Sequence, residues 1–150
     1  MSSTANSKKT PCIVGFEVFA ETRNFAQARE ECKKLGLKLA LPTSAMDEDA
    51  IIAAINTKEP EISSRWSTIT LGTLKPLWID IELDYHNNPL VPLDYTNWAE
   101  TQPDNSAEKC VIYSYLKYGW IDRLCEDFFP YVCQFPGKLC QNLRQNICDF

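Results

Sequence analysis

The sequence predicts a single α+β domain that is stabilised by disulfide bonds, with two helices packed on short antiparallel sheets and a long irregular loop region. Its 150 residues, 45% of them apolar, suit one packed core. Two segments carry helix start signals, and several short runs are rich in the aliphatic, β-branched and aromatic residues of strands. Seven cysteines indicate an oxidising compartment, because disulfides do not persist in a reducing cytosol.

The first helix is predicted to start after Asn24, a good N-cap residue, and to end at Gly36, which adopts a left-handed conformation without strain. An apolar stripe at helical spacing places Cys32 on the buried face. The residues of this stripe are Phe25, Ala28, Arg29, Cys32 and Leu35. A short strand over residues 38–41 is predicted to follow.

The second helix is predicted to open at Ser44, because a serine followed three residues later by Asp47 has the pattern of a capping box. Its apolar residues are Ile51, Ile52 and Ile55. The next segment, 57–75, is polar and irregular, so we expect a loop in which Trp66, beside Arg65, is a partly buried staple without a ligand-binding role.

The domain is predicted to span residues 12–135, with strands over 77–83, 110–115 and 131–135. Residues 1–11 are polar and lack apolar periodicity, so we expect a flexible N-terminal arm. Residues 136–150 form a cysteine-containing C-terminal extension, and an apolar residue at every fourth position predicts a short helix there. These apolar residues are Leu139, Leu143 and Ile147.

The cysteines could instead hold zinc, but their spacing argues against it. The chain has no C-x-x-C pair and a single histidine, His86. The net charge of −5 also makes nucleic acid an unfavourable partner. The chain has no apolar run that could span a membrane and no secretory signal, so we expect the mature or a recombinant form of a soluble, secreted protein.

Side chains that offer oxygen ligands gather in the second half of the chain. Gln102, Asp104 and Glu108 lie around Pro103, and Asp122 follows at a distance. Oxygen ligands held close together suit a hard cation or a polyhydroxylated ligand. The features of an enzyme are missing: no serine lies in a G-x-S-x-G turn, and a glycosidase pair of Glu108 and Asp122 would need a deep cleft.

These residues also carry a resemblance to the C-type lectin-like domain family, over roughly residues 12–135. Two tripeptides resemble the Q-P-D and W-N-D motifs of its sugar site, and two upstream segments resemble its W-I-G-L core strand and the approach to the first tripeptide. In order along the chain they are Leu77-Trp78-Ile79-Asp80-Ile81, Tyr95-Thr96-Asn97-Trp98, Gln102-Pro103-Asp104 and Trp120-Ile121-Asp122. The resemblance implies a C-type lectin-like fold with the bridges Cys32–Cys133 and Cys110–Cys125, and with Asp122 inside the loop that the second bridge closes.

The resemblance further implies a calcium ion that binds two neighbouring hydroxyls of a sugar. Its ligands here would be Gln102, Asp104, Glu108 and Asp122. Two residues depart from this pattern. Ile121 stands where the family has Asn, which removes one of the six to eight oxygens that calcium prefers, and Arg123 can neutralise the carboxylates by forked hydrogen bonds. We therefore expect calcium dependence to be weak or absent.

The Q-P-D tripeptide resembles the galactose and N-acetylgalactosamine type of site. Without a metal, the choice of sugar would depend on direct hydrogen bonds with Asp104, Asn105 and Arg123, and an N-acetyl group of the sugar could form such bonds. Tyr118 is expected in a turn, where its ring could stack on a sugar. Four other aromatic residues are assigned to the core: Trp98, Tyr113, Tyr115 and Trp120.

The sequence thus predicts a secreted lectin for terminal galactose-type or N-acetylated hexoses (GalNAc or GlcNAc) on oligosaccharides and glycoconjugates, with a role in innate recognition of glycans. The alternative is a metal-free module that binds a protein partner. Weak single sites gain avidity when subunits are linked. Since three cysteines remain after the two bridges, we expect a disulfide-linked homo- or heterodimer in which one of them joins the chains. The three are Cys12, Cys140 and Cys148.

Overall fold

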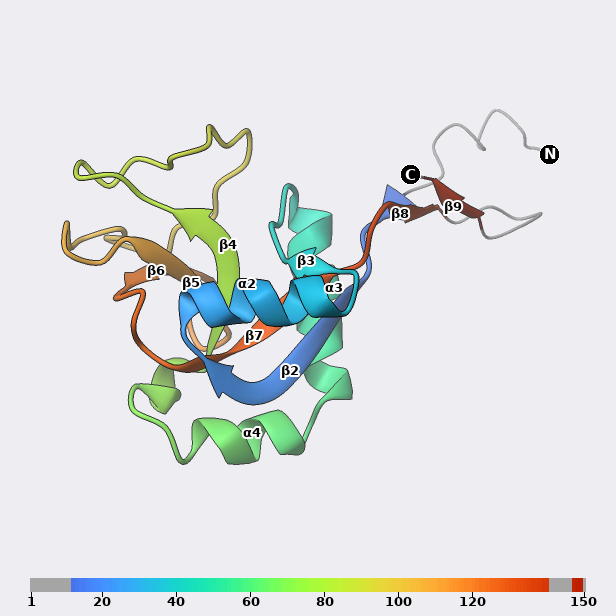
Figure 1. Cartoon of the computed structure of the whole chain (residues 1–150), viewed down its shortest axis with the longest axis horizontal. Coiled ribbons are helices and arrows are strands. Elements are labelled where there is room, and N and C mark those ends of the chain that lie inside the picture. The colour runs from blue at the N-terminus through green and yellow to red at the C-terminus, as the bar shows by residue number, and fades with distance from the viewer. Residues whose placement is uncertain (1–11, 141–146, 150) are drawn as a thin grey trace.

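The computed structural model describes residues 12–140 and 147–149, with side chains over 14–137. The predicted arm, 1–11, lies outside the described residues. Figure 1 shows a twisted central sheet with helices packed on it and a small sheet at one end. The helices are α2 (Phe25–Lys34), α3 (Ala45–Thr57), α4 (Glu61–Trp66) and the 3-10 helix η1 (Gly72–Leu74). The strands are β1 (Cys12–Ile13), β2 (Phe16–Arg23), β3 (Lys38–Leu39), β4 (Pro76–Glu82), β5 (Cys110–Ser114), β6 (Gly119–Arg123), β7 (Phe129–Gln134), β8 (Lys138–Cys140) and β9 (Ile147–Asp149).

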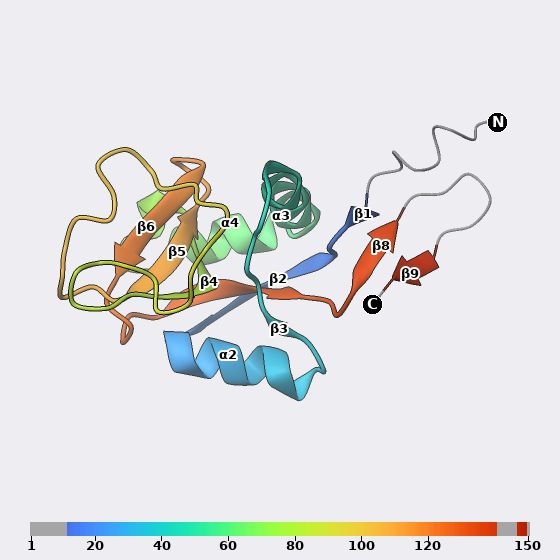
Figure 2. The ribbon, with the colours of Figure 1, turned by 90° about the horizontal axis from the view of Figure 1, so that it is seen from above.

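The central sheet has the strand order β2-β7-β4-β5-β6, and β3 also pairs with β7. All of its pairings are antiparallel except β4 with β7, which is parallel, so the prediction of purely antiparallel sheets is wrong at this point. The general α+β prediction is confirmed. Figure 2 shows α2 on one side of β2 and β7, and α3 and α4 on the other.

Both faces of the central strands are buried, and alternate residues enter two different cores. Along β4, Leu77, Ile79 and Ile81 pack in the core beneath α3 and α4, whereas Trp78 packs in the core beneath α2. Along β5, Val111 belongs to the first core and Ile112 to the second. This alternation is the two-residue period of a strand, and it explains why these segments are apolar almost throughout.

Helix α2 starts and ends as predicted. The side chain of Asn24 accepts a hydrogen bond from the Gln27 N–H at 2.9 Å, and the side chain of Gln27 accepts one from the Asn24 N–H at 3.2 Å. This reciprocal pair is a capping box, and it satisfies two amide groups that the helix leaves unpaired. Gly36 follows the helix at φ +76°. The buried stripe is narrower than predicted, since Arg29 and Leu35 are exposed.

Helix α3 also begins where Ser44 predicted it. The Ser44 hydroxyl accepts a hydrogen bond from the Asp47 N–H at 3.1 Å, which is half of a capping box. The other half is absent, because the Asp47 carboxylate accepts from the Thr43 N–H at 2.8 Å and from the Thr43 hydroxyl at 2.9 Å. The cap is therefore extended by one residue upstream of the helix.

The prediction of a structureless loop over 57–75 is wrong, because this segment contains α4 and η1. Ile62 and Trp66 lie four residues apart on one face of α4 and are both buried. The indole N–H of Trp66 donates to the Pro76 carbonyl at 3.0 Å, so the predicted staple is a core residue. Tertiary burial of two side chains thus stabilises a helix whose N-terminus has no side-chain cap.

The predicted helix of the C-terminal extension is wrong for the residues that the structure describes. Leu139 lies in β8 and Ile147 in β9, which form a second sheet with β1, while Leu143 lies outside the described residues. In this sheet Cys12 stands directly opposite Cys140, and Cys148 stands opposite Leu139. Strands from the two ends of the described chain therefore pair with each other, next to the central sheet (Figure 1).

Both bridges that the resemblance implied are present. Cys32 of α2 is bonded to Cys133 of β7, and Cys110 of β5 is bonded to Cys125. The first bridge joins residues 101 apart in sequence and the second joins residues 15 apart. The first holds α2 on the sheet, and the second closes the chain around β6.

We predict that the long-range bridge contributes more to stability than the short one. Replacing Cys32 and Cys133 by alanine should lower the free energy of unfolding by ~4.7 kcal/mol, the chain-entropy value for a closed loop of about 100 residues. Replacing Cys110 and Cys125 should lower it by ~3 kcal/mol, the value for about 15 residues. Urea unfolding of the two variants tests this, and a larger loss from the second pair would contradict it.

Candidate functional site

The predicted site residues come from three places at the β6 end of the central sheet. Gln102, Asp104, Asn105 and Glu108 lie in the loop before β5, Tyr118 lies in the turn after β5, and Asp122 and Arg123 lie on β6. Strand β6 was not predicted, and Asp122 is a strand residue and not a loop residue. Its partner across the β5–β6 pairing is Val111.

Backbone hydrogen bonds hold the loop against the free edge of β6. The Trp120 N–H donates to the Asn97 carbonyl at 2.8 Å, and the Ala99 N–H donates to the Trp120 carbonyl at 2.9 Å. Gly119 allows this close approach, because a Cβ atom there would lie 3.0 Å from the backbone nitrogen of Ala99. The segment 97–99 thus covers the edge and directs the following residues towards Asp122.

The Asp122 carboxylate is fully buried and holds the loop through backbone amides. Its Oδ1 accepts from the Asp104 N–H at 3.3 Å, and its Oδ2 accepts from the Asn105 N–H at 3.0 Å. Burial raises the pKa of Asp122 above its usual range, while these hydrogen bonds act in the opposite direction. Asp122 therefore shapes the loop even without a ligand.

Three carboxylates meet at this point. Ligand oxygens of Asp104, Glu108 and Asp122 lie within 4.8 Å of one another. The Gln102 amide N–H donates to Asp104 Oδ2 at 3.1 Å, whereas Gln102 Oε1 is buried without a hydrogen-bond partner among the described residues. The structure thus brings together the four residues that the resemblance named as ligands.

Arg123 contacts only one of the three carboxylates. Its guanidinium lies 2.7 Å from Glu108 Oε2 and 3.0 Å from Asp127 Oδ2, and no ion pair with Asp104 or Asp122 is found among the described side chains. The expectation that it neutralises all three directly is therefore wrong. Burial raises the pKa of Glu108, and the charge of Arg123 opposes this shift. Asp127 was not predicted, because a spacing of four residues brings two side chains together on a helix, whereas Arg123 ends a strand.

The residues present offer the type of ligand that calcium prefers, but not all of their oxygen atoms are available to an ion. Carboxylates and a spare amide oxygen are the ligands that a hard cation prefers. However, both oxygens of Asp122 already accept hydrogen bonds from the chain, and one oxygen of Glu108 is ion-paired with Arg123. Ile121 adds no ligand, since its side chain has no oxygen, and it packs in the core beneath α2. A bound cation would have to compete with these internal donors.

A depression with a volume of ≈ 420 Å³ lies next to Gln102, and none of the three clustered carboxylates lines it. Its lining residues are Ala99, Glu100, Thr101, Gln102, Lys117 and Ile121. Glu100, Thr101 and Lys117 were not predicted as site residues, and nothing in their sequence pattern distinguishes them from other surface residues. Tyr118 is 58% exposed, and its ring packs edge-on against Tyr115 at 5.6 Å between centroids.

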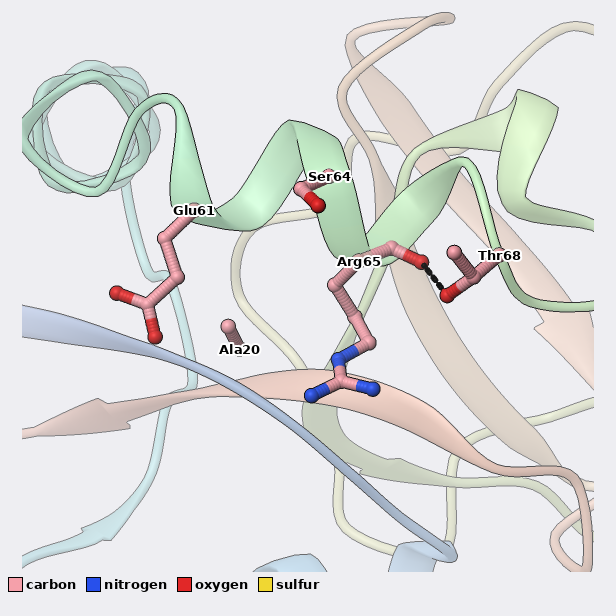
Figure 3. Close-up of a pocket in the computed structure, with 5 residues that line it drawn as sticks. All are labelled: Ala20, Glu61, Ser64, Arg65 and Thr68. Carbon is pink, nitrogen blue, oxygen red and sulfur yellow. Dashed lines mark hydrogen bonds between the residues drawn. The ribbon is translucent and has the colours of Figure 1, made fainter.

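A second depression of ≈ 260 Å³ lies between α4 and β2, away from every predicted site residue. Figure 3 shows Glu61 and Arg65 reaching from α4 towards the sheet, with Ala20 of β2 between them. The Thr68 hydroxyl donates to the Arg65 carbonyl at 2.9 Å. All the polar residues that line this depression are exposed, and their pattern indicates no ligand class.

Comparisons with known proteins agree on one family. The profile of the Lectin C-type domain matches residues 21–135. Tetranectin from Homo sapiens is 27% identical over 139 residues, which cover 85% of this chain and 65% of tetranectin.

Solved structures show the same fold at low identity. The C-type lectin domain of murine dendritic cell inhibitory receptor 2, solved in complex with N-glycan, superposes with a TM-score of 0.61 at 20% identity, over 79% of this chain and 88% of that one. The Ca²⁺-independent C-type lectin SPL-2 from Saxidomus purpuratus superposes with a TM-score of 0.59 at 18% identity, over 80% and 84%. No described helix is long and apolar enough to cross a membrane.

We predict that Arg123→Ala destabilises the protein in a pH-dependent manner. Glu108 would lose its nearest cation while it stays buried beside two carboxylates, which should cost about 1–3 kcal/mol of unfolding free energy at neutral pH. The pKa of Glu108 should rise further, and a raised carboxyl pKa penalises the folded state fully above that pKa and not at all below the pKa of the unfolded chain. The loss should therefore shrink as the pH falls and Glu108 becomes protonated in both states.

Urea unfolding at neutral and acid pH measures this difference. Arg65→Ala is the matched control, because Arg65 makes no ion pair among the described residues and lies on α4. An equal loss at both pH values would show that Arg123 acts through packing and not through its charge.

Proposed function

The chain belongs to the Lectin C-type domain family, and on that premise we propose that it is a lectin for terminal galactose-type or N-acetylated hexoses whose binding depends weakly or not at all on calcium. Like its relatives, it is a binding protein and not an enzyme. The proposal depends mainly on one observation: three carboxylates gather at the β6 edge, and groups of the chain itself already compensate two of them.

The proposed independence of calcium follows from that compensation. Calcium binds well where several carboxylates are held together and no cation or hydrogen-bond donor of the protein interacts with them, because the ion then removes their mutual repulsion. Here the positive charge of Arg123 balances the charge of Glu108, and two backbone N–H groups donate hydrogen bonds to the carboxylate of Asp122. An ion would gain less from this site than from an uncompensated one. The fold is compatible with such binding, since one structural neighbour is described as a Ca²⁺-independent C-type lectin.

In the proposed site, sugar hydroxyls bind directly to the chain. Asp104 is exposed and offers acceptor oxygens, and the Asn105 side chain is exposed beside it. Arg123 supplies a fixed positive charge at the inner side of the cluster. Tyr118 presents an exposed ring on which sugar C–H groups can pack. The neighbouring depression of ≈ 420 Å³ leaves room for a substituent such as an N-acetyl group.

The second candidate function is a metal-free module that binds a protein. The loop between β4 and residue 97 presents large apolar side chains to solvent, with Tyr85 80%, Leu90 59% and Val91 69% exposed. Exposed apolar side chains that lie close together in a loop are frequent at protein interfaces. This candidate predicts that a protein ligand binds while no glycan does.

We further propose a secreted protein with a lectin domain over 12–135, a flexible N-terminal arm over 1–11 and a cysteine-containing extension over 136–150. The two disulfides support an oxidising compartment. We also propose a role in innate recognition of glycans. Because binding at a single site would be weak, this role would require several linked sites. The register of β1 with β8 supports an internal bridge between Cys12 and Cys140, because residues directly opposite in such a pair lie at disulfide distance.

We predict that Asp104→Ala and Asp122→Ala each abolish glycan binding on an array of terminal galactose, GalNAc and GlcNAc, while the unmodified chain binds equally with and without a chelator. Asp104 is an exposed partner for the ligand, and removing such a charged partner typically costs ~2–5 kcal/mol, which is enough to lose a weak interaction. Asp122 is buried, and its loss would free the backbone amides of Asp104 and Asn105, so the loop that presents Asp104 would lose its order. Asp94→Ala, an exposed acid in the same loop region, serves as the control. Loss of binding in chelator would overturn the calcium proposal alone, and absence of glycan binding under all conditions would favour the protein-binding candidate.

We also predict a dimer linked through Cys148. Seven cysteines leave one unpaired after three internal bridges, and the proposed Cys12–Cys140 bridge makes Cys148 the remaining one. Electrophoresis without reductant should show a dimer that Cys148→Ser converts to monomer, whereas Cys140→Ser should not remove the band. A monomer in the unmodified chain would contradict the covalent dimer.

A further inference from the structure

A buried carboxylate lies behind the proposed site and takes no part in it. Glu48, in the first turn of α3, is only 6% exposed. Its Oε2 accepts a hydrogen bond from the indole N–H of Trp120 at 2.8 Å, across 72 residues of sequence. The neighbouring Asp47 is occupied by the helix cap, so Glu48 is the carboxylate of this turn that faces the sheet. No sequence pattern indicated a role for Glu48.

Trp120 connects Glu48 to the site loop. Its backbone exchanges hydrogen bonds with Asn97 and Ala99, and its ring packs edge-on against Tyr95 and Trp98 at 5.9 and 5.5 Å between centroids. Two residues further along β6, Asp122 holds the amides of Asp104 and Asn105. A displacement of the Trp120 ring would therefore reach the loop over 97–105 through backbone contacts.

The surroundings of Glu48 disfavour its negative charge. Asp47 and Asp49 lie on its own helix, Tyr95 faces it from the site loop and Tyr113 faces it from β5. Glu48 makes no ion pair among the described side chains. Its Oε1 and the Tyr113 hydroxyl are both buried without a hydrogen-bond partner in the described part of the chain. Burial raises the pKa of Glu48, while the Trp120 hydrogen bond acts in the opposite direction, as does the nearby Asn97 side-chain amide, which donates to the Tyr118 carbonyl at 3.1 Å.

We propose that Glu48 is a positioning residue of the site, which holds Trp120 in place and makes the order of the loop over 97–105 depend on pH. The hydrogen bond to Trp120 exists in both protonation states of Glu48, because the carboxyl group accepts in either. In the charged state, a buried oxygen without a donor favours any opening of the loop that brings water to it. When Glu48 is neutral, its charge no longer favours opening of the loop.

The direction of the pH effect follows from the raised pKa. An acid with a raised pKa in the folded state penalises that state at pH values above the shifted pKa, and the penalty disappears below the ordinary value near 4.5, where both states are protonated. The closed loop should therefore become less stable as the pH rises through the pKa of Glu48. Glu48→Gln keeps an acceptor for Trp120 without the charge, so it should remove this part of the pH dependence.

Amide hydrogen exchange tests the proposal without any sugar. We expect the protection factor of the Ala99 amide, corrected for the intrinsic exchange rate, to fall with rising pH in the unmodified chain and to fall clearly less in Glu48→Gln, where Asp122 and Glu108 still titrate beside the loop. Asp49→Asn, which removes a neighbouring exposed charge, is the matched control and should keep the pH dependence of the unmodified chain, moved to slightly lower pH because Asp49 helps to raise the pKa of Glu48. Glu48→Ala should lower the protection about tenfold at every pH, since a buried indole N–H loses its acceptor.

The same pH dependence in Glu48→Gln and in the unmodified chain would overturn the proposal, even if Glu48→Ala failed to fold. Its consequence for binding rests on the proposed function and is measured separately on GalNAc-agarose. Glu48→Gln should bind at least as well as the unmodified chain at neutral pH, and Glu48→Ala should bind about tenfold more weakly. Changed exchange at Ala99 with no binding by any variant would reject the lectin proposal and leave the positioning role intact.

Discussion

The whole structure depends on the burial of both faces of the central sheet. The strands β4, β5 and β7 place alternate side chains in two cores, so each face must be covered. Helix α2 covers one face, and α3 with α4 covers the other (Figure 2). The bridge from Cys32 to Cys133 fastens α2 to its face. Because the helices cover the faces, the edge at β6 remains for loops, and the candidate site forms there.

The β6 edge combines a structural and a chemical task in one short strand. Trp120 enters the core, Ile121 enters the opposite core, and Asp122 ties down the loop through backbone amides. A carboxylate buried for this purpose would be costly without donors, and the loop supplies them. The same donors reduce what a cation could gain at this point. Loop order and metal affinity therefore compete for the same oxygen atoms.

Local sequence signals predicted the two capped helices, because Asn24 and Ser44 act within four residues of the chain. The local pattern of oxygen-bearing side chains already indicated Gln102, Asp104, Glu108 and Asp122, whereas the disulfide pairing and the role of these four residues as one ligand set came only from the resemblance. Sequence reasoning missed α4, which has no side-chain cap and is stabilised by the burial of Ile62 and Trp66. Such burial depends on partners far away in the sequence.

Strand β6 was missed for a related reason. Asp122 and Arg123 are unusual in a strand, and they are tolerated because the loop and Glu108 supply their partners. Glu48 lies 72 residues from Trp120, so its role could not be predicted from spacing. Arg123 was recognised as a cation among acids, but its choice of Glu108 and Asp127 depends on the geometry of the folded edge. A role that depends on a partner far away in the sequence, such as that of Glu48, has no local pattern from which it could be predicted.

The small sheet of β1, β8 and β9 lies at one end of the molecule, and β6 lies at the other (Figures 1 and 2). This polarity determines how the domain can be displayed. A tether joined at the small sheet, whether a carrier protein, a bead or a sensor surface, would leave the β6 edge pointing away from the support. An orientation of this kind suits recognition of a facing surface, where a ligand must be reached across a gap.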